Sequence, residues 1–379
     1  MPNYDEIAIH RPELARGYLA LLQAQPGRPI AMFAPRRVGK TYFLDHDLAP
    51  LARDNGLLPV YADLWLQRTS PLQAINHALE EALDDLAVPQ SRVGKLARTP
   101  IKKLGALGAS LDLGEPPTRR ALPEVAELRL DALVTRVVAA AGKPVLLLLD
   151  EVQALGDVAS GESVVAALRA VLHKRRAVVQ AVFTGSSQEA LARMVATAGA
   201  PMYQFAQMLD FPVLGDAFLQ RLAKHYARVH PGKQLVLDDL RRLFARIGFK
   251  PALMKDIVKA MSAEGVVDVD AAVLHFLKDD RHVAGWRALL QSLDAFERGL
   301  LQAIAQGLPP MGRSTLDALA ARPGAAPPTI AKVRSAIVRL RRTGILAGRG
   351  AGAAQIEDPL LREYLVGAAG LAEAAPRLR

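Results

Sequence analysis

The sequence predicts an α/β protein with a parallel sheet in the first half of the chain and two helical regions after it. Three observations lead to this prediction. Up to about residue 213, apolar strand-like runs alternate with segments of helical period. One run, 144–150 (PVLLLLD), is uninterrupted, as expected for a strand buried on both faces of a sheet. After residue 213 the alternation stops and helical patterns dominate.

Five strands and the helices between them form the predicted core. Helices of this length between strands act as crossovers, so the strands would run parallel with helices on both faces. The predicted strands are 29–34, 57–65, 144–150, 177–184 and about 208–213. The predicted helices are 41–53, 71–86, 124–141, 162–173 and 188–196. A segment rich in proline and glycine, about 89–123, interrupts the alternation and is predicted to be an insertion with one short hairpin.

Two further domains are predicted after this core, which spans 1–213. Helical patterns at 216–230, 237–247, 251–262 and 269–278 form the first of them, 214–292. The second, 293–379, has helices at 294–306, 314–321 and 329–343, a glycine-rich segment at 345–359, and a short final helix around 362–365. Three helices followed by a strand, a glycine loop and a strand are typical of a winged helix-turn-helix.

Composition excludes several classes of protein. With 51% hydrophobic and 23% charged residues among 379, the chain has the composition of a typical globular protein. It has no cysteine, which excludes disulfides, zinc ribbons, thiol nucleophiles and iron–sulfur clusters and fits a reducing cytoplasm. No apolar run approaches membrane-spanning length and the start of the chain lacks a signal-peptide pattern, so we expect a cytoplasmic protein with no membrane partner. The net charge of +10 permits a nucleic-acid partner but also serves solubility.

A phosphate-binding loop is predicted at 34–41 (APRRVGKT), between a strand and a helix. It matches the template G-x-x-x-x-G-K-[ST] except that Ala34 replaces the first glycine. Backbone N–H groups and the helix N-terminus would bind phosphate, Lys40 would add a positive charge, and Thr41 would offer its hydroxyl to Mg²⁺. A G-K-T triplet alone also arises by chance, but the strand before it and the helix after it favour a nucleotide site. The predicted ATP contacts here are Pro35, Arg36, Arg37, Val38, Gly39, Lys40, Thr41 and Tyr42.

A second motif, Asp150 and Glu151, ends the apolar strand at 144–150. Ligands of open α/β sheets bind at the carboxyl ends of the strands, which is where this pair would lie. Asp150 could then hold Mg²⁺ and Glu151 could act as the general base toward water. A core strand that merely ends at a solvated acidic pair is the alternative, but two such motifs on one sheet favour a site for MgATP.

The sequence resembles the P-loop ATPases of the AAA+ and STAND type, in particular the archaeal ATPase family that is also found in bacteria. The segments that carry the resemblance cover most of the chain: 35–41 (PRRVGKT), 146–155 (LLLLDEVQAL), 183–191 (FTGSSQEAL), 248–254 (GFKPALM) and 356–365 (IEDPLLREYL). The resemblance implies binding of ATP or ADP with Mg²⁺, a helical lid at 214–292 and a C-terminal winged helix.

The resemblance also implies roles for single residues. Thr184 or Ser186 would sense the γ-phosphate, although Ser186 could equally cap the following helix. Arg193 would complete the site as an arginine finger, in cis or from a neighbouring subunit, or else is a solvated helix residue. Pro251 would lie in a lid segment that touches the base, and Lys250 stands where a histidine is frequent.

The predicted helix 329–343 is strongly basic. As the third helix of a winged domain it would face a duplex DNA groove; packing on the ATPase core or on a partner is the alternative. The candidate DNA contacts are Lys332, Arg334, Arg339, Arg341, Arg342 and Arg349.

Together these patterns predict an ATPase that binds and hydrolyses ATP as a nucleotide-driven switch or assembly factor, with a homo-oligomer or a protein as partner. The alternative is a DNA-binding regulator for which ATP is only a conformational ligand. The intact Glu151 favours hydrolysis. A scaffold with a degenerate site is disfavoured because Lys40 and Asp150 are both present.

Overall fold

The computed structural model describes residues 7–87, 121–156, 158, 160–186, 194–195, 199–322, 328–348 and 353–374. Two compact units make up the chain. The sheet unit comprises His10–Ala34 and Lys40–Phe211, and the helical unit comprises Met1–Ile9, Pro35–Gly39 and Pro212–Arg379. The hairpin expected within 89–123 and most of the helix expected at 188–196 lie outside the described residues.

The sheet unit is built on five parallel strands in the order β2-β3-β4-β1-β5. Their bounds are β1 Ile30–Phe33, β2 Leu58–Asp63, β3 Val145–Asp150, β4 Val179–Gly185 and β5 Gln207–Asp210. The register pairs Asp63 with Asp150, so β2 and β3 end at the same level of the sheet. The predicted parallel α/β core is confirmed.

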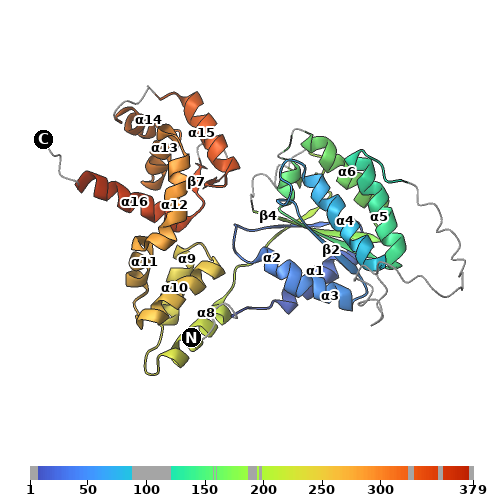
Figure 1. Ribbon diagram of the computed structural model, residues 1–379, viewed down its shortest axis with the longest axis horizontal. Helices are drawn as coiled ribbons and strands as arrows, with labels where there is room; N and C mark the ends of the chain where they lie inside the picture. Colours follow the sequence, from blue (N-terminus) through green and yellow to red (C-terminus); the bar gives the residue numbers. More distant parts are fainter. Residues whose placement is uncertain are drawn as a thin grey trace, which may run out of the picture. The chain divides into compact units, whose positions relative to one another are not determined.

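Helices cover both faces of this sheet (Figure 1). One face carries α1 (Pro12–Ala24), α2 (Lys40–Phe43) and α3 (Ala49–Asp54). The other carries α4 (Pro71–Ala87), α5 (Ala126–Ala141) and α6 (Gly161–Lys174). The sequence analysis did not predict α1, which begins with proline in its first turn and buries one apolar stripe.

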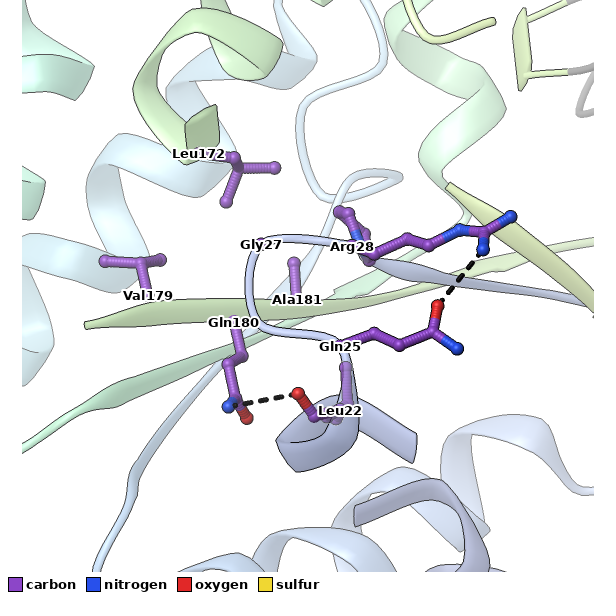
Figure 2. A pocket seen from close by; sticks show the side chains of 9 residues that line it. Leu22, Gln25, Gly27, Arg28, Leu172, Val179, Gln180 and Ala181 are labelled. Atoms are coloured by element: carbon purple, nitrogen blue, oxygen red, sulfur yellow. Dashed lines mark hydrogen bonds between the residues drawn. The ribbon is translucent and has the colours of Figure 1, made fainter. Parts of the chain in front are cut away.

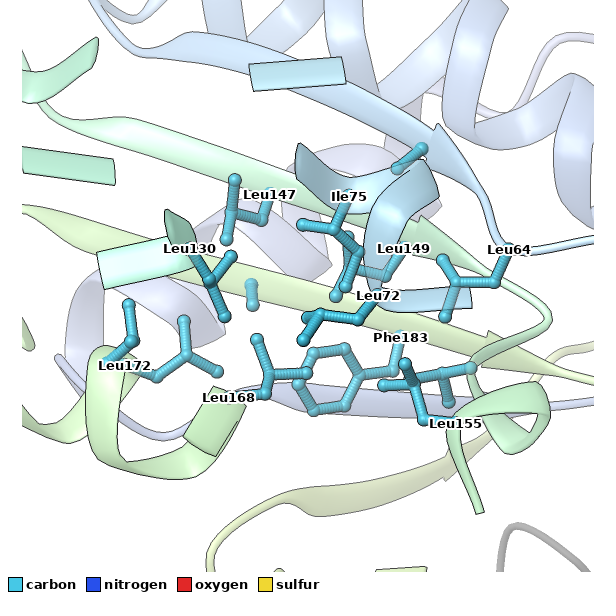
Figure 3. Packing of buried hydrophobic residues seen from close by; sticks show 14 of the residues in the cluster. Leu64, Leu72, Ile75, Leu130, Leu147, Leu149, Leu155, Leu168, Leu172 and Phe183 are labelled. Carbon is cyan, nitrogen blue, oxygen red and sulfur yellow. The ribbon is translucent and has the colours of Figure 1, made fainter. Parts of the chain in front are cut away.

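Burial on both faces explains the unbroken apolar run of β3, all six residues of which are buried. Alternate side chains, Leu147 and Leu149, belong to the core under α4, α5 and α6. Figure 3 shows them beside Phe183 of β4 and the leucines of the covering helices. Leu146 and Leu148 point the other way and are equally inaccessible.

The helix after the phosphate loop is not continuous, contrary to the prediction of one helix at 41–53. A π-helical segment, η2 (Leu44–Leu48), separates α2 from α3, and the Ala49 N–H bonds to the carbonyl of Leu44, five residues back. The following residue, Pro50, has no N–H and cannot donate the next helical hydrogen bond. The change from α-helical to π-helical hydrogen bonding occurs in the turn just before it.

The helical unit contains two hydrophobic clusters among its described residues. The first is formed mainly by α8, α9, α10 and α11. Their bounds are α8 Asp216–Val229, α9 Leu237–Arg246, α10 Pro251–Glu264 and α11 Val269–Lys278. A further helix, α12 (Asp280–Ser292), follows and was not predicted; few of its described side chains are deeply buried.

The second cluster holds together α13 (Ala295–Ala305), α14 (Arg313–Ala320), α15 (Ile330–Arg342) and the short antiparallel pair β6 (Leu346–Ala347) and β7 (Gln355–Ile356). Asp294 and Glu297 form a capping box at the start of α13, and the Thr329 side chain caps α15. The last helix, α16 (Pro359–Ala374), is longer than the short one predicted around 362–365. The alanines around its two glycines favour helix strongly enough to offset them.

Within the described part of the chain, none of the helices combines the length and the apolar character needed to cross a membrane.

Candidate functional site

The phosphate loop joins β1 to α2 and bends through two left-handed residues. Arg37 has φ 65° and Gly39 has φ 97°. Glycine suits position 39 because this dihedral angle is strained for any residue with a Cβ atom. Ala34, which departs from the phosphate-loop template, is not in the left-handed region, so its Cβ atom costs no backbone strain here.

Lys40 opens α2 and its side chain is buried, with 5% of the residue exposed. The ammonium Nζ donates a hydrogen bond to the carbonyl of Ala34, 2.7 Å away at the other end of the loop. The ammonium group is therefore held beside the carbonyl of Ala34, at the end of β1.

Asp150 lies at the carboxyl end of β3 and accepts hydrogen bonds on both oxygens. Its Oδ2 accepts from the hydroxyl of Thr41 at 2.6 Å and from the phenol of Tyr61 at 3.2 Å. Its Oδ1 accepts from the hydroxyl of Thr184 and from the backbone N–H of Glu151 at 3.1 Å. A carboxylate that accepts this many bonds is fixed in one orientation.

Glu151 adopts a left-handed backbone, with φ 57°, which is uncommon for a residue other than glycine. Its N–H also contacts the Thr184 hydroxyl at 3.2 Å. Its carboxylate oxygen Oε2 accepts from the hydroxyl of Ser186 at 2.5 Å and from the side-chain amide of Gln153. Strained backbone of this kind is concentrated at functional sites. Here it turns the side chain that follows Asp150 toward the end of β4.

The sequence analysis missed two residues of this cluster, Tyr61 and Gln153. A signal for Tyr61 exists: it is a polar aromatic within the apolar run of the predicted strand 57–65, and it stands two residues before the end of β2. The missing information was the register of β2 against β3, which brings Tyr61 diagonally next to Asp150. Gln153 lies in the 3₁₀ turn η3 (Val152–Leu155), within the segment 146–155 that carries the resemblance, but no role was predicted for it.

Electrostatics keep the Tyr61 phenol protonated. Burial and then the negative charges of Asp150 and Asp63 raise the pKa of Tyr61 well above its ordinary value. The phenol is therefore a hydrogen-bond donor at every physiological pH.

The donor set at Asp150 fits Mg²⁺ held together with a nucleotide. Mg²⁺ takes one or two carboxylates plus phosphate oxygens and water, and the Thr41 hydroxyl and the Asp150 carboxylate lie side by side. Among the residues that the structure describes, no group of three or more His, Asp or Glu side chains is placed to hold a metal by itself. The cluster thus suits a metal that arrives with its phosphates.

The other predicted nucleotide contacts are distributed as follows. Thr184 is fully buried and donates to Asp150, while Ser186 donates to Glu151. Most of the helix that Ser186 was alternatively expected to cap lies outside the described residues. Tyr42 stacks on His46, with the ring centroids 4.1 Å apart. Arg193 lies outside the described residues.

Pro251 begins α10 in the helical unit, after the left-handed residues Gly248 and Phe249. The neighbouring Lys250 is buried and its Nζ lies 3.3 Å from the carboxylate of Asp358.

The predicted DNA-contact residues lie on or just after α15 and differ in their surroundings. Arg339 donates from Nε to the carboxylate of Glu297 at 2.9 Å, and Lys332 lies over the ring of Phe296. Arg334 is exposed and Arg341 is partly buried. Arg342 ends α15, but its side chain is outside the described residues, as is all of Arg349.

A shallow pocket lies at the opposite edge of the sheet, near the start of β4 (Figure 2). The side-chain amide of Gln180 donates to the carbonyl of Leu22, and Arg28 donates to Gln25. None of the motif residues lines it. The chemistry of this unit is therefore gathered at the carboxyl edge of the sheet.

Comparisons with known proteins find likeness in structure but not in sequence. Neither a profile of a protein family nor any curated protein sequence matches this chain. Among solved structures, the chain is similar to the Walker-type ATPase of Pyrococcus abyssi, with TM-score 0.59 and 15% identity over 96% of this chain and 98% of that one. It is also similar to the Aeropyrum pernix ORC2 protein, solved as ADPNP–ADP complexes, with TM-score 0.51 and 16% identity over 98% of each chain.

At these identities the likeness shows the fold. The parallel sheet with its covering helices and helical C-terminal region is the fold of AAA+ P-loop ATPases. The predicted fold class is confirmed.

Proposed function

We propose that this chain binds MgATP at the carboxyl edge of its sheet and hydrolyses it, acting as a nucleotide-driven switch or assembly factor of the AAA+/STAND type. The observation that carries the proposal is the hydrogen bond between Thr41, in the first turn after the phosphate loop, and Asp150, at the end of β3. These residues are 109 positions apart in the sequence, and their contact supports the proposal because a hydroxyl and a carboxylate at these two places would hold a phosphate-bound Mg²⁺.

Each residue of the cluster has a chemical task in this proposal. Lys40, which now donates to the carbonyl of Ala34, would donate to phosphate oxygens instead. Thr41 and Asp150 would hold Mg²⁺, which would neutralise charge on the β- and γ-phosphates.

Glu151 would accept a proton from the attacking water. The water oxygen then bonds to the γ-phosphorus, the bond from that phosphorus to the bridging oxygen breaks, and ADP and phosphate leave. Ser186 and Gln153 hold the Glu151 carboxylate in place for this step. Thr184 and Ser186 would act as the sensors of the γ-phosphate. Thr184 would do so through its hydrogen bond to Asp150, and Ser186 through its hydrogen bond to Glu151.

The predicted domain roles are part of the proposal. Residues 214–292 would act as the lid, with Pro251 near the base, and residues 293–379 as a winged helix-turn-helix. The order α13, α14, α15 and then the β6–β7 pair supports the latter. Arg193 would serve as the arginine finger, and the partner would be a protein or further copies of this chain.

The alternative, a DNA-binding regulator in which ATP sets only the conformation, is favoured by the exposed Arg334 and Lys332 on α15. Turnover separates the two proposals, because a pure regulator would bind MgATP with negligible hydrolysis in the presence and absence of duplex DNA.

The test of nucleotide binding is Lys40→Ala, measured by calorimetry with MgATP. Loss of a charged hydrogen-bond donor should weaken binding by about tenfold to a hundredfold or more. Lys143→Ala is the matched control, since Lys143 is an exposed lysine just before β3, at the opposite edge of the sheet. Thermal unfolding of both variants checks that the fold is intact. An affinity within a few-fold of wild type for a folded Lys40→Ala would show that the phosphate loop is misassigned.

A further inference from the structure

A tyrosine outside both nucleotide motifs contacts the carboxylate assigned to Mg²⁺. Tyr61 lies on β2, which is an edge strand of the sheet and pairs with β3. The register places Asp63 opposite Asp150 and Tyr61 opposite Leu148. Side chains two residues apart on a strand share a face, so Tyr61 and Asp150 are diagonal neighbours on one face. The phenol reaches across to Oδ2 of Asp150 at 3.2 Å.

The contact falls on the oxygen of Asp150 that faces the phosphate-loop helix. Oδ2 also accepts from Thr41, whereas Oδ1 is held by Thr184 and by the N–H of Glu151. Tyr61, which belongs to neither nucleotide motif, therefore donates a neutral hydrogen bond to Oδ2, the oxygen of Asp150 that also contacts Thr41. In metal sites, a hydrogen bond of this kind orients the ligand and tunes its affinity.

The ring of Tyr61 lies on the face of β2 opposite to the core under α4 and α5. Tyr61 is 39% exposed, and the neighbours on its strand, Val60 and Ala62, are the residues that pack under α4 and α5. Removal of the hydroxyl alone should therefore change the surroundings of Asp150 and leave the packing unaltered.

We propose that Tyr61 is a positioning residue for the magnesium site, acting through Asp150. Its phenol holds the carboxylate in the orientation that binds Mg²⁺ together with the nucleotide phosphates. The proposal rests on the proposed nucleotide site and assigns to it a residue that the two motifs do not contain.

The experiment compares Tyr61→Phe with wild type by calorimetry of ADP binding, first in EDTA and then over a series of Mg²⁺ concentrations. ADP is chosen because it reports metal binding without turnover. The Mg²⁺ concentration that gives half of the metal-dependent gain in affinity should rise about tenfold in the variant. ADP affinity in EDTA and the thermal unfolding midpoint should stay as in wild type. The matched control is Tyr203→Phe, because Tyr203 belongs to the same unit and is also 39% exposed.

The outcomes separate this proposal from the one it rests on. A wild type that binds no ADP, with or without Mg²⁺, overturns the proposed nucleotide site and the role of Tyr61 with it. A wild type that binds ADP equally well in EDTA and in Mg²⁺ overturns the magnesium site and the role of Tyr61. Normal Mg²⁺ dependence in Tyr61→Phe overturns the role of Tyr61 alone. An equal loss of affinity in EDTA and in Mg²⁺, or a lowered unfolding midpoint, would make Tyr61 a structural residue and also overturn the proposal.

Discussion

At the carboxyl ends of β3 and β4, the polar side chains are buried and hydrogen-bond to one another, whereas along α15 the basic side chains differ from residue to residue. Asp150 and Thr184 are almost inaccessible and share a hydrogen bond. On α15, Arg339 bonds to Glu297 of the neighbouring helix α13, while Arg334 is exposed. Both regions were identified from the sequence by residue type and position.

The difference shows what residue type alone can indicate about function. Burying a polar group costs free energy unless the group is hydrogen-bonded. A cluster of buried polar groups at the carboxyl ends of the strands therefore points to a function more strongly than surface charges do. Exposed arginines have no such desolvation cost. Arg339 already forms an ion pair with the carboxylate of Glu297. The count of basic residues on α15 therefore overstates the charge available to a nucleic acid.

The largest expected effect concerns the buried cluster. Glu151→Gln should keep MgATP bound but slow steady-state hydrolysis about 10²- to 10⁴-fold, because the amide cannot accept the proton from water. Phosphate release measured beside calorimetry gives both quantities on one sample. Gln153→Ala is the control for simple disturbance of the cluster and should have a smaller effect. Unchanged hydrolysis in Glu151→Gln would place the base elsewhere.

Thr184→Val tests whether the buried cluster is held together by its own hydrogen bonds. The change conserves shape but removes a donor to Asp150, and it should lower the free energy of unfolding by about 1–3 kcal/mol. Thr135→Val is the control: that hydroxyl lies on the exposed surface of α5, donates to the carbonyl of Asp131 and accepts from the guanidinium of Arg175. Because these bonds are exposed to solvent, their loss should cost about 1 kcal/mol or less. Chemical denaturation measures the free energy of unfolding of both variants. Equal losses would show that the buried cluster is no more dependent on its hydrogen bonds than the surface of α5.

The smallest expected effect concerns α15 and duplex DNA. If Lys332 and Arg334 contact phosphates, reversing both to Glu should weaken binding at low salt and reduce the slope of log affinity against log salt by about 0.9 for each contact. Filter binding with mixed-sequence duplex at about 50 mM salt is a suitable measurement, because phosphate contacts are strong there.

Arg339→Ala separates a role in DNA binding from a role in packing, when filter binding and thermal unfolding are both measured. Because Arg339 is tied to Glu297, its loss should lower the stability of the α13–α15 region more than it lowers DNA affinity. No retention of duplex by the wild type would remove DNA from the proposed partners, and α15 would then be a packing or protein-contact helix.

The sequence by itself determined the parallel sheet and the end of β3 at Asp150, whereas β2 and β5 end at Asp63 and Asp210, before the predicted ends at 65 and about 213. This follows from local pattern: an apolar run ends where its strand leaves the core, so Asp150 and Glu151 stand at the end of β3. Lys40 and Thr41 open α2 after the loop that follows β1. Tertiary structure decided how the residues are used. The β2–β3 register brought Tyr61 to Asp150, and the left-handed backbone of Glu151 turned its carboxylate toward Ser186. Packing of α15 on α13 paired Arg339 with Glu297. Each of these contacts joins residues from different strands, turns or helices, and the pattern within one segment carries no information about the register or packing that brings two segments together.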